Sequence, residues 1–169
     1  FKLAEILDVY DSDMNKTGSL DRESVHKLGL WHVVAHIWLI DIKEDKVSVY
    51  FQKRSMNKAQ QPGLFDIAVG GHISSGENAQ DGAVREMYEE MGILADRDKL
   101  IYLGRVKEDD FECDREFGEV FLYILDREPK IGEEVEMYVK IDAEDYFEFL
   151  NHNKSCVKAV CENGEIIDI

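Results

Sequence analysis

The chain has 169 residues, 44% of them hydrophobic and 33% charged, which fits one soluble domain with a buried core over residues 1–169. It carries 20 Lys and Arg against 36 Asp and Glu, a formal net charge of −16, and such a field disfavours nucleic acid and anionic membranes as partners. The longest apolar stretch, near residues 30–40, is too short to cross a bilayer. Three cysteines without metal-ligand spacing indicate a reducing compartment, so we expect a cytoplasmic protein.

The first residues, 1–29, are predicted to form an extension that precedes the core. The segment from Glu5 to Tyr10 favours a short strand, and the segment 13–18, which contains Asp, Asn and Gly, favours a turn. Asp21 is placed to cap a short helix that ends before Gly29.

The core is predicted to span residues 30–155 and to begin with a pair of strands. Residues 30–42 are apolar and rich in β-branched side chains, which is typical of a buried strand. Residues 46–53 alternate between apolar and polar and should pair with that strand across a tight turn. A further strand is expected over residues 64–69.

The second half of the chain interleaves helices and strands. We expect helices over 79–91 and 143–151, strands over 100–107, 119–125 and 134–141, a mobile acidic loop over 108–116, and a terminal hairpin over 156–169. This order favours an α/β fold in which a mixed sheet lies between helices.

The helix predicted at 79–91 carries a group of carboxylates on one face. Glu86, Glu89 and Glu90 stand at positions i, i+3 and i+4, so their side chains are neighbours. Three like charges in one turn repel each other by about 0.2–0.5 kcal/mol per pair. A bound Mg²⁺ turns that repulsion into attraction, because hard divalent ions prefer carboxylate oxygens and water. Taken alone, the pattern is more typical of a solvated acidic face.

Two more residues frame this face of the helix. Arg85 lies beside the carboxylates and Glu77 lies one loop upstream. An ion pair between them is expected to fix the loop against the helix. Gly71 permits a sharp backbone turn where the loop begins.

The segment 71–93 resembles the Nudix box, G-x₅-E-x₇-R-E-U-x-E-E-x-G-U, in which U is a bulky apolar residue. All nine specified positions match, from Gly71 to Gly92 and Ile93. The resemblance implies an α/β/α sandwich with a mixed sheet and a loop–helix–loop metal site. It also implies Mg²⁺- or Mn²⁺-dependent hydrolysis of a diphosphate attached to an organic group.

The resemblance assigns roles to the box residues position by position. Glu86, Glu89 and Glu90 are the implied metal ligands, and Arg85 and Glu77 are the implied structural pair, with Glu77 also a candidate metal contact. The general base differs among family members, so Glu86, Glu89 and a carboxylate from a later loop all stay open.

Flanking residues are similar to the Nudix branch of type 1 isopentenyl-diphosphate isomerase. The similar segments are Trp31-His32, His36-Ile-Trp38, Gln52-Lys-Arg54-Ser55, Lys58, Pro62-Gly63-Leu-Phe65-Asp66 and Gly71-His72. These isomerases hold a divalent metal with several His and Glu residues and protonate an alkene with a Cys and a Glu.

Two features of the chain depart from the isomerase pattern. The isomerase Cys precedes a Gly-His pair, and this chain has Gly70 there, which has no group that can move a proton to carbon. Of these helix glutamates, isomerases keep only the one at the position of Glu90, whereas this chain also has Glu86 and Glu89. Both departures favour hydrolysis. Glu119 matches the later isomerase glutamate approximately and is a candidate ligand or base.

The histidines have competing interpretations. His72 matches an isomerase metal ligand, but without the Cys a role in shaping the loop is favoured. His32 and His36 lie on the same side of an apolar strand, where hydrogen-bonded core histidines are the more frequent case. His26 is expected to be an exposed helix residue.

Arg54 and Lys58 match isomerase positions that hold the diphosphate, with a solvated loop as the alternative. Cys113 matches no isomerase residue, so no chemical role is assigned to it.

We therefore expect a Mg²⁺- or Mn²⁺-dependent pyrophosphohydrolase that acts on a nucleoside or prenyl diphosphate. One rival is an isomerase that leaves the diphosphate intact. The other is a Nudix domain kept as a ligand-binding or regulatory module, which the complete set of box carboxylates disfavours. A homodimer is also compatible with the sequence.

Overall fold

The computed structural model describes residues 4–57, 62–111 and 114–169. The strands are β1 (Ile6–Tyr10), β2 (Lys16–Asp21), β3 (His32–Lys43), β4 (Lys46–Arg54), β5 (Phe65–Ile67), β6 (Val69–His72), β7 (Ile101–Phe111), β8 (Asp114–Ile124), β9 (Val135–Asp142), β10 (Lys158–Cys161) and β11 (Ile166–Asp168). The helices are α1 (Arg22–Lys27), α2 (Ala79–Met91), the 3₁₀ helix η1 (Arg97–Lys99) and α3 (Ala143–Leu150). None of the helices in these described ranges has the length and hydrophobicity needed to cross a membrane.

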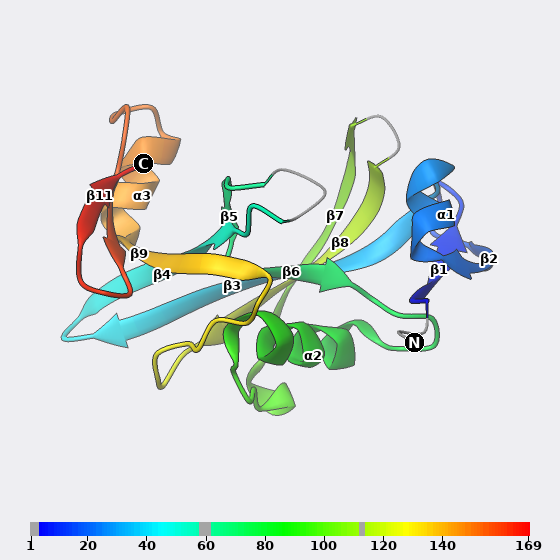
Figure 1. Ribbon diagram of the computed structural model, residues 1–169, viewed down its shortest axis with the longest axis horizontal. Helices are drawn as coiled ribbons and strands as arrows, with labels where there is room; N and C mark the ends of the chain where they lie inside the picture. Colours follow the sequence, from blue (N-terminus) through cyan, green and yellow to red (C-terminus); the bar gives the residue numbers. More distant parts are fainter. Residues whose placement is uncertain (1–3, 58–61, 112–113) are drawn as a thin grey trace.

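A mixed sheet forms the centre of the molecule, with the strand order β11-β10-β9-β4-β3-β8-β7. The pair β3–β8 is parallel, whereas the neighbouring pairs are antiparallel. Strands β3 and β4 pair only over residues 40–43 and 46–49 and then separate. β6 pairs with the free part of β3, and β5 pairs with the free part of β4. The separation leaves β6 beside α2 (Figure 1), where Gly71 and Gly70 face Glu86 and Glu90 in the second half of the helix.

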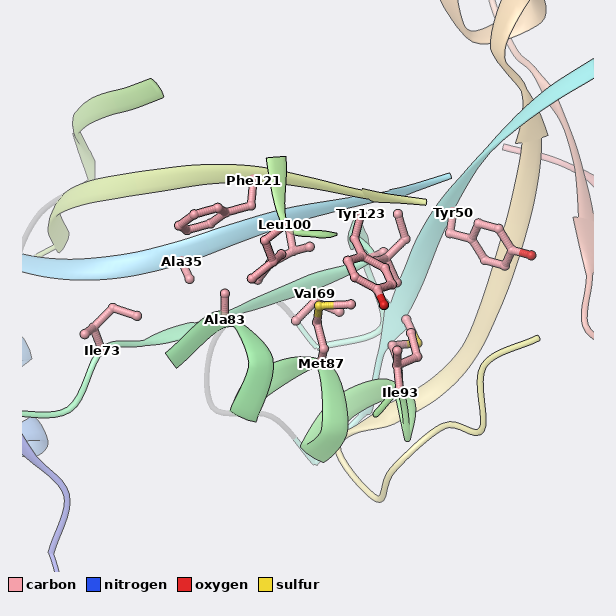
Figure 2. Packing of buried hydrophobic residues seen from close by; sticks show 14 of the residues in the cluster. Ala35, Tyr50, Val69, Ile73, Ala83, Met87, Ile93, Leu100, Phe121 and Tyr123 are labelled. Carbon is pink, nitrogen blue, oxygen red and sulfur yellow. The ribbon is translucent and has the colours of Figure 1, made fainter. Parts of the chain in front are cut away.

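Helices cover both faces of the sheet. On one face, Ala83, Met87 and Met91 of α2 are fully buried in a cluster that includes Ala35 and Ile37 of β3 (Figure 2). On the other face, α3 packs Tyr146 and Phe149 against a second cluster built on β4, β9 and β10. The arrangement is the predicted α/β/α sandwich (Figure 1), and the predicted fold class is confirmed.

Helix α2 is well defined at both ends. The side chain of Asn78 accepts a hydrogen bond from the amide of Asp81, and Gly92 closes the helix in the left-handed conformation at φ 61°. Burying a methionine side chain contributes about 1.5–3 kcal/mol. Met87 and Met91 therefore hold the helix in place against the much smaller repulsion among its carboxylates.

The N-terminal extension is an antiparallel β1–β2 hairpin followed by α1. The turn expected at 13–18 is shorter than predicted, because β2 begins at Lys16. Leu7, Val9 and Val25 form a small core of their own. The extension joins the rest of the chain through backbone hydrogen bonds from Tyr10 N to Trp31 O (2.9 Å) and from Ser75 N to Ile6 O (2.7 Å).

The prediction of an acidic loop over 108–116 is wrong. β7 continues to Phe111 and β8 already begins at Asp114, so the charged residues lie on paired strands. Strand pairing with neighbours overrides the low β-propensity of Asp and Glu here. The strand expected at 64–69 is divided into β5 and β6, and β6 extends to His72.

Candidate functional site

The carboxylates of α2 face the glycines of β6. Glu90 is 3% exposed, and its Oε2 accepts hydrogen bonds from the amide of Gly70 (3.1 Å) and from Nε2 of Gln52 (3.0 Å). Glu86 is also buried, whereas the side chain of Glu89 is 56% exposed. The group thus has a fixed, buried part and a part that reaches solvent.

Gly71 is required because the Glu86 carboxylate lies against its backbone. A Cβ on residue 71 would lie 2.1 Å from Cδ of Glu86, far inside van der Waals contact. Oε1 of Glu86 lies 2.6 Å from Nη1 of Arg85. Burial nevertheless dominates over this ion pair and raises the pKa of Glu86 to about 7.

Arg85 ties the loop before α2 to the helix, as predicted from the spacing. Its Nε and Nη2 donate to the two carboxylate oxygens of Glu77 at 3.1 and 2.9 Å, and Nη2 also donates to the carbonyl of His72 at 2.8 Å. Burial opposes ionisation of Glu77, but the bonds from Arg85 and from the amide of Ser74 hold the pKa of Glu77 below its ordinary value. The pair fixes the loop.

The residues on α2 fit a hard divalent cation. Their ligand atoms are carboxylate oxygens, which Mg²⁺ and Mn²⁺ prefer. Because Gly71 has no side chain, the Glu86 carboxylate occupies the place that a Cβ on residue 71 would fill. Glu86, Glu89 and Glu90 stay the predicted ligands of that ion.

A second group of ligand-type side chains comes from helix α1 and from strands β3, β6 and β8. His26, His32, His72 and Glu116 each offer a ligand atom within 4.8 Å of the others. Nε2 of His72 lies 3.2 Å from Nε2 of His26, and the rings of His72 and His32 are stacked. Nε2 of His32 lies 3.5 Å from Oε1 of Glu116. We call these four residues the imidazole centre.

Two atoms around the imidazole centre lack a hydrogen-bond partner among the described residues. They are Nε2 of the fully buried His32 and Oδ1 of Asp114. Nδ1 of His32 lies 3.0 Å from the carbonyl of Leu30, a contact that assigns the ring proton to Nδ1. The lone pair on Nε2 then faces Glu116. Histidines that bind a metal commonly have this arrangement, in which the other ring nitrogen donates its proton to a carbonyl. The chemistry of the imidazole centre fits a divalent transition metal.

Sequence reasoning missed two members of the imidazole centre. His26 was expected to be exposed on its helix, but it is half-buried between His32 and His72. Glu116 lay in the supposed acidic loop. No local signal identifies either residue, because α1 reaches β6 only through docking of the N-terminal extension.

Glu119 lies on the opposite face of the sheet from Glu116. It is buried, and it accepts hydrogen bonds from the hydroxyl of Tyr102 (2.7 Å) and from Nε of Arg105 (2.6 Å). It lines a pocket of about 260 Å³ between the hairpin and the start of α2, which also includes Glu77. The predicted role of Glu119 as ligand or base stays a prediction, and its contacts favour a structural one.

The predicted diphosphate-binding residues are only partly described. Nη1 of Arg54 lies 3.2 Å from Oδ2 of Asp66, next to the loop that follows β4. Lys58 and Cys113 lie outside the described residues.

Comparison with known proteins places this geometry in a family. The family model for the NUDIX domain matches residues 30–153. A Nudix hydrolase of Clostridium acetobutylicum, described as uncharacterized, is 36% identical over 97% of this chain and 81% of its own length. An isopentenyl-diphosphate Δ-isomerase of Serratia proteamaculans is 30% identical over 75% of this chain and 69% of its own.

Other relatives and solved structures agree with this placement. The chain spans 22% to 54% of the length of three further Nudix hydrolases, so the activities of those whole proteins do not transfer directly. The crystal structure of a protein from Deinococcus radiodurans covers 89% of this chain and 91% of its own at a TM-score of 0.65 and 19% identity, which shows a shared fold. The chain is therefore an enzyme of the Nudix hydrolase family, with isopentenyl-diphosphate isomerases among its relatives.

Proposed function

We propose that the chain is a Mg²⁺- or Mn²⁺-dependent pyrophosphohydrolase that cleaves the diphosphate linkage of a small nucleoside or prenyl diphosphate. The observation that carries the proposal is the position of the α2 carboxylates: Glu86 and Glu90 are buried against Gly71 and Gly70, and Glu89 stands beside them toward solvent. A set of oxygen ligands at a solvent boundary fits a hydrated divalent ion.

The residues of the site are proposed to have separate roles in the reaction. A divalent cation bound at the site supplies charge neutralisation of the phosphates and a lowered pKa of bound water. Glu90 is held rigidly by Gln52 and Gly70 and serves as a fixed ligand. Glu86 and Glu89 are the candidates for the proton acceptor, and a pKa of about 7 allows Glu86 to exchange a proton near neutral pH.

Arg85 acts through the residues that it positions. Its guanidinium contacts Glu77, Glu86 and Glu89 and also the backbone of His72. It therefore holds the loop and the helix in register. Arg54 and Lys58 are proposed to orient the diphosphate, with Asp66 fixing the direction of the Arg54 side chain.

The imidazole centre is proposed to hold a cation of its own, and one of its members, His72, matches an isomerase metal ligand. The buried lone pair of His32 Nε2 supports this second candidate site. A cation at the imidazole centre does not make the chain an isomerase, because residue 70 is glycine and cannot move a proton to carbon. A Cβ at this position would meet Ile67 and Ala35 only at 3.7–3.9 Å, so the glycine is not required by packing and the acid is simply missing.

The test is an assay of phosphate and pyrophosphate release with millimolar Mg²⁺ across nucleoside and prenyl diphosphates. Hydrolysis that is lost in Glu90→Gln supports the proposal. Alkene conversion with the diphosphate intact identifies an isomerase, and binding of diphosphates without turnover identifies a regulatory module. The predicted homodimer and cytoplasmic location are tested separately, by light scattering after gel filtration and by cell fractionation.

A further inference from the structure

We propose that the imidazole centre is one half of a dinuclear metal site, in which Glu116 is shared with a second cation position formed by His36, Glu108 and Glu116. This inference rests on the proposed cation at the imidazole centre and is independent of hydrolysis at the α2 carboxylates.

The three residues of the second position come from adjacent strands. His36 lies on β3, Glu116 on β8 and Glu108 on β7, and these strands are neighbours in the order β3-β8-β7. Each residue offers one ligand atom within 4.8 Å of the others. Glu116 belongs both to this group and to the imidazole centre. A carboxylate with two oxygens is suited to bridge two metal ions, which in two-metal sites lie about 3.5–4 Å apart.

Gly118 makes room for the His36 ring. His36 pairs with Val120 in the register of β3 and β8, two residues beyond Gly118. A Cβ on Gly118 would lie 3.0 Å from both Cε1 and Nδ1 of His36. One edge of the imidazole therefore lies close over the glycine, on the face of β8 that also carries Glu116. A larger residue at 118 would displace the ring from that position.

The negative charges along β7 and β8 also favour binding of a cation. Glu108 and Glu116 are directly opposite each other in the antiparallel register. Like charges in such a pair are destabilising, and within the described ranges neither carboxylate forms an ion pair with Lys or Arg. A metal ion between them and His36 removes this repulsion.

The ligand types indicate which metal binds. One imidazole and two carboxylates favour Mn²⁺, Fe²⁺, Co²⁺ or Zn²⁺ over Mg²⁺, which prefers oxygen ligands and water. The α2 carboxylates and the dinuclear site thus differ in ion class. Mn²⁺ is the best probe, because it accepts both ligand types and has a spin signal that changes when two ions are coupled.

The experiment counts Mn²⁺ ions in a protein whose α2 site is removed by the combined changes Glu86→Gln, Glu89→Gln and Glu90→Gln. Metal content after equilibrium dialysis is expected to be two ions per chain, with an electron paramagnetic resonance spectrum of a coupled pair. His36→Ala and Glu108→Gln, each in this background, should lower the content to one ion and abolish the coupling.

A matched control is Asp109→Asn, because Asp109 neighbours Glu108 but pairs with Arg115. This variant should keep both ions. A content of one ion that His36→Ala and Glu108→Gln leave unchanged would overturn the proposal. Circular dichroism of each variant verifies folding, and the unaltered chain with Mn²⁺ gives the coupling measurement without any substitution. Failure of hydrolysis in the unaltered chain changes none of these counts, so the two proposals fail separately.

Discussion

The α2 carboxylates and the imidazole centre are built in opposite ways. Glu86, Glu89 and Glu90 come from one turn of one helix. The members of the imidazole centre, in contrast, come from four elements that lie between residues 26 and 116 of the chain. The first group gathers as soon as the helix forms. The second exists only after the extension, β3, β6 and β8 have docked. A site that depends on local geometry can be recognised in a sequence, and a site that depends on docking cannot.

The largest effect is expected from Glu90→Gln. The amide removes a negative charge at a buried, fixed position, and metal stabilisation worth several kcal/mol should be lost. We expect hydrolysis to fall by roughly 1000-fold, since about 1.36 kcal/mol corresponds to tenfold in rate. Turnover with saturating Mg²⁺ is the measurement, with the exposed Glu162→Gln as the control. The imidazole centre should still bind Mn²⁺, and a complete loss there would contradict the separation of the two sites.

The next effect concerns two adjacent glycines of β6. Gly71→Ala places a Cβ on the Glu86 carboxylate, whereas Gly70→Ala places one at ordinary contact distance. We expect Gly71→Ala to weaken Mg²⁺ affinity and activity by roughly 10- to 100-fold, the range seen when a ligand's support is lost. Gly70→Ala should retain both. Calorimetric titration with Mg²⁺ measures the difference, and equal behaviour of the two variants would refute the steric argument.

A smaller effect is expected from pH, because burial raises the pKa of Glu86 from 4.5 to about 7. Without metal, the folded state holds this proton between the two values and the unfolded state does not. Stability from this group is therefore fully present below about pH 4.5 and is lost as pH rises through about 7, by on the order of 2–3 kcal/mol.

Denaturant unfolding of the metal-free protein from pH 4 to pH 8 measures this slope. Glu86→Gln should flatten it, because the amide does not titrate. Mg²⁺ affinity should rise over the same range, since the ion binds the ionised form. An affinity that is constant from pH 5 to pH 8 would rule out Glu86 as a titrating ligand.

The smallest effect is expected at the contact between the hairpin and the loop before α2. Oδ1 of Asp8 accepts hydrogen bonds from the hydroxyls of Ser75 (2.5 Å) and Ser19 (2.7 Å), and Oδ2 pairs with Lys16. Asp8→Asn should cost about 0.5–1.5 kcal/mol and should change Mg²⁺ affinity by no more than a few fold. Thermal unfolding and calorimetry measure both, with the exposed Asp13→Asn as control. A loss of Mg²⁺ binding as large as that of Gly71→Ala would show that the loop depends on the hairpin.

The parts of the structure that follow local rules could be predicted from the sequence. Helix α2 begins after Asn78 and ends at Gly92 because its capping groups lie next to it in the chain. The pair β3–β4 follows from alternation and a tight turn. The Arg85–Glu77 pair follows from spacing, because a loop of this length returns Glu77 to the start of the helix.

The parts that depend on pairing between distant segments could not be predicted. The strand character of residues 108–116 comes from the register of β7 with β8, not from the propensity of Glu and Asp. The face on which Glu119 lies is set by strand alternation, which places it with Tyr102 and Arg105, away from His32. His26 belongs to a metal-type cluster only because α1 lies beside β6.

The bond from Nη2 of Arg85 to the carbonyl of His72 has a thermodynamic consequence. One guanidinium contacts the carboxylate side of the molecule and also the backbone of a residue whose ring lies in the imidazole centre. A displacement of Glu86 would reach this guanidinium directly, and through it the backbone of His72. Because coupling between binding equilibria is reciprocal, any change that an ion at one location makes in the affinity of the other is matched by the same factor in the reverse direction. Titrations with one metal therefore report on both locations at once.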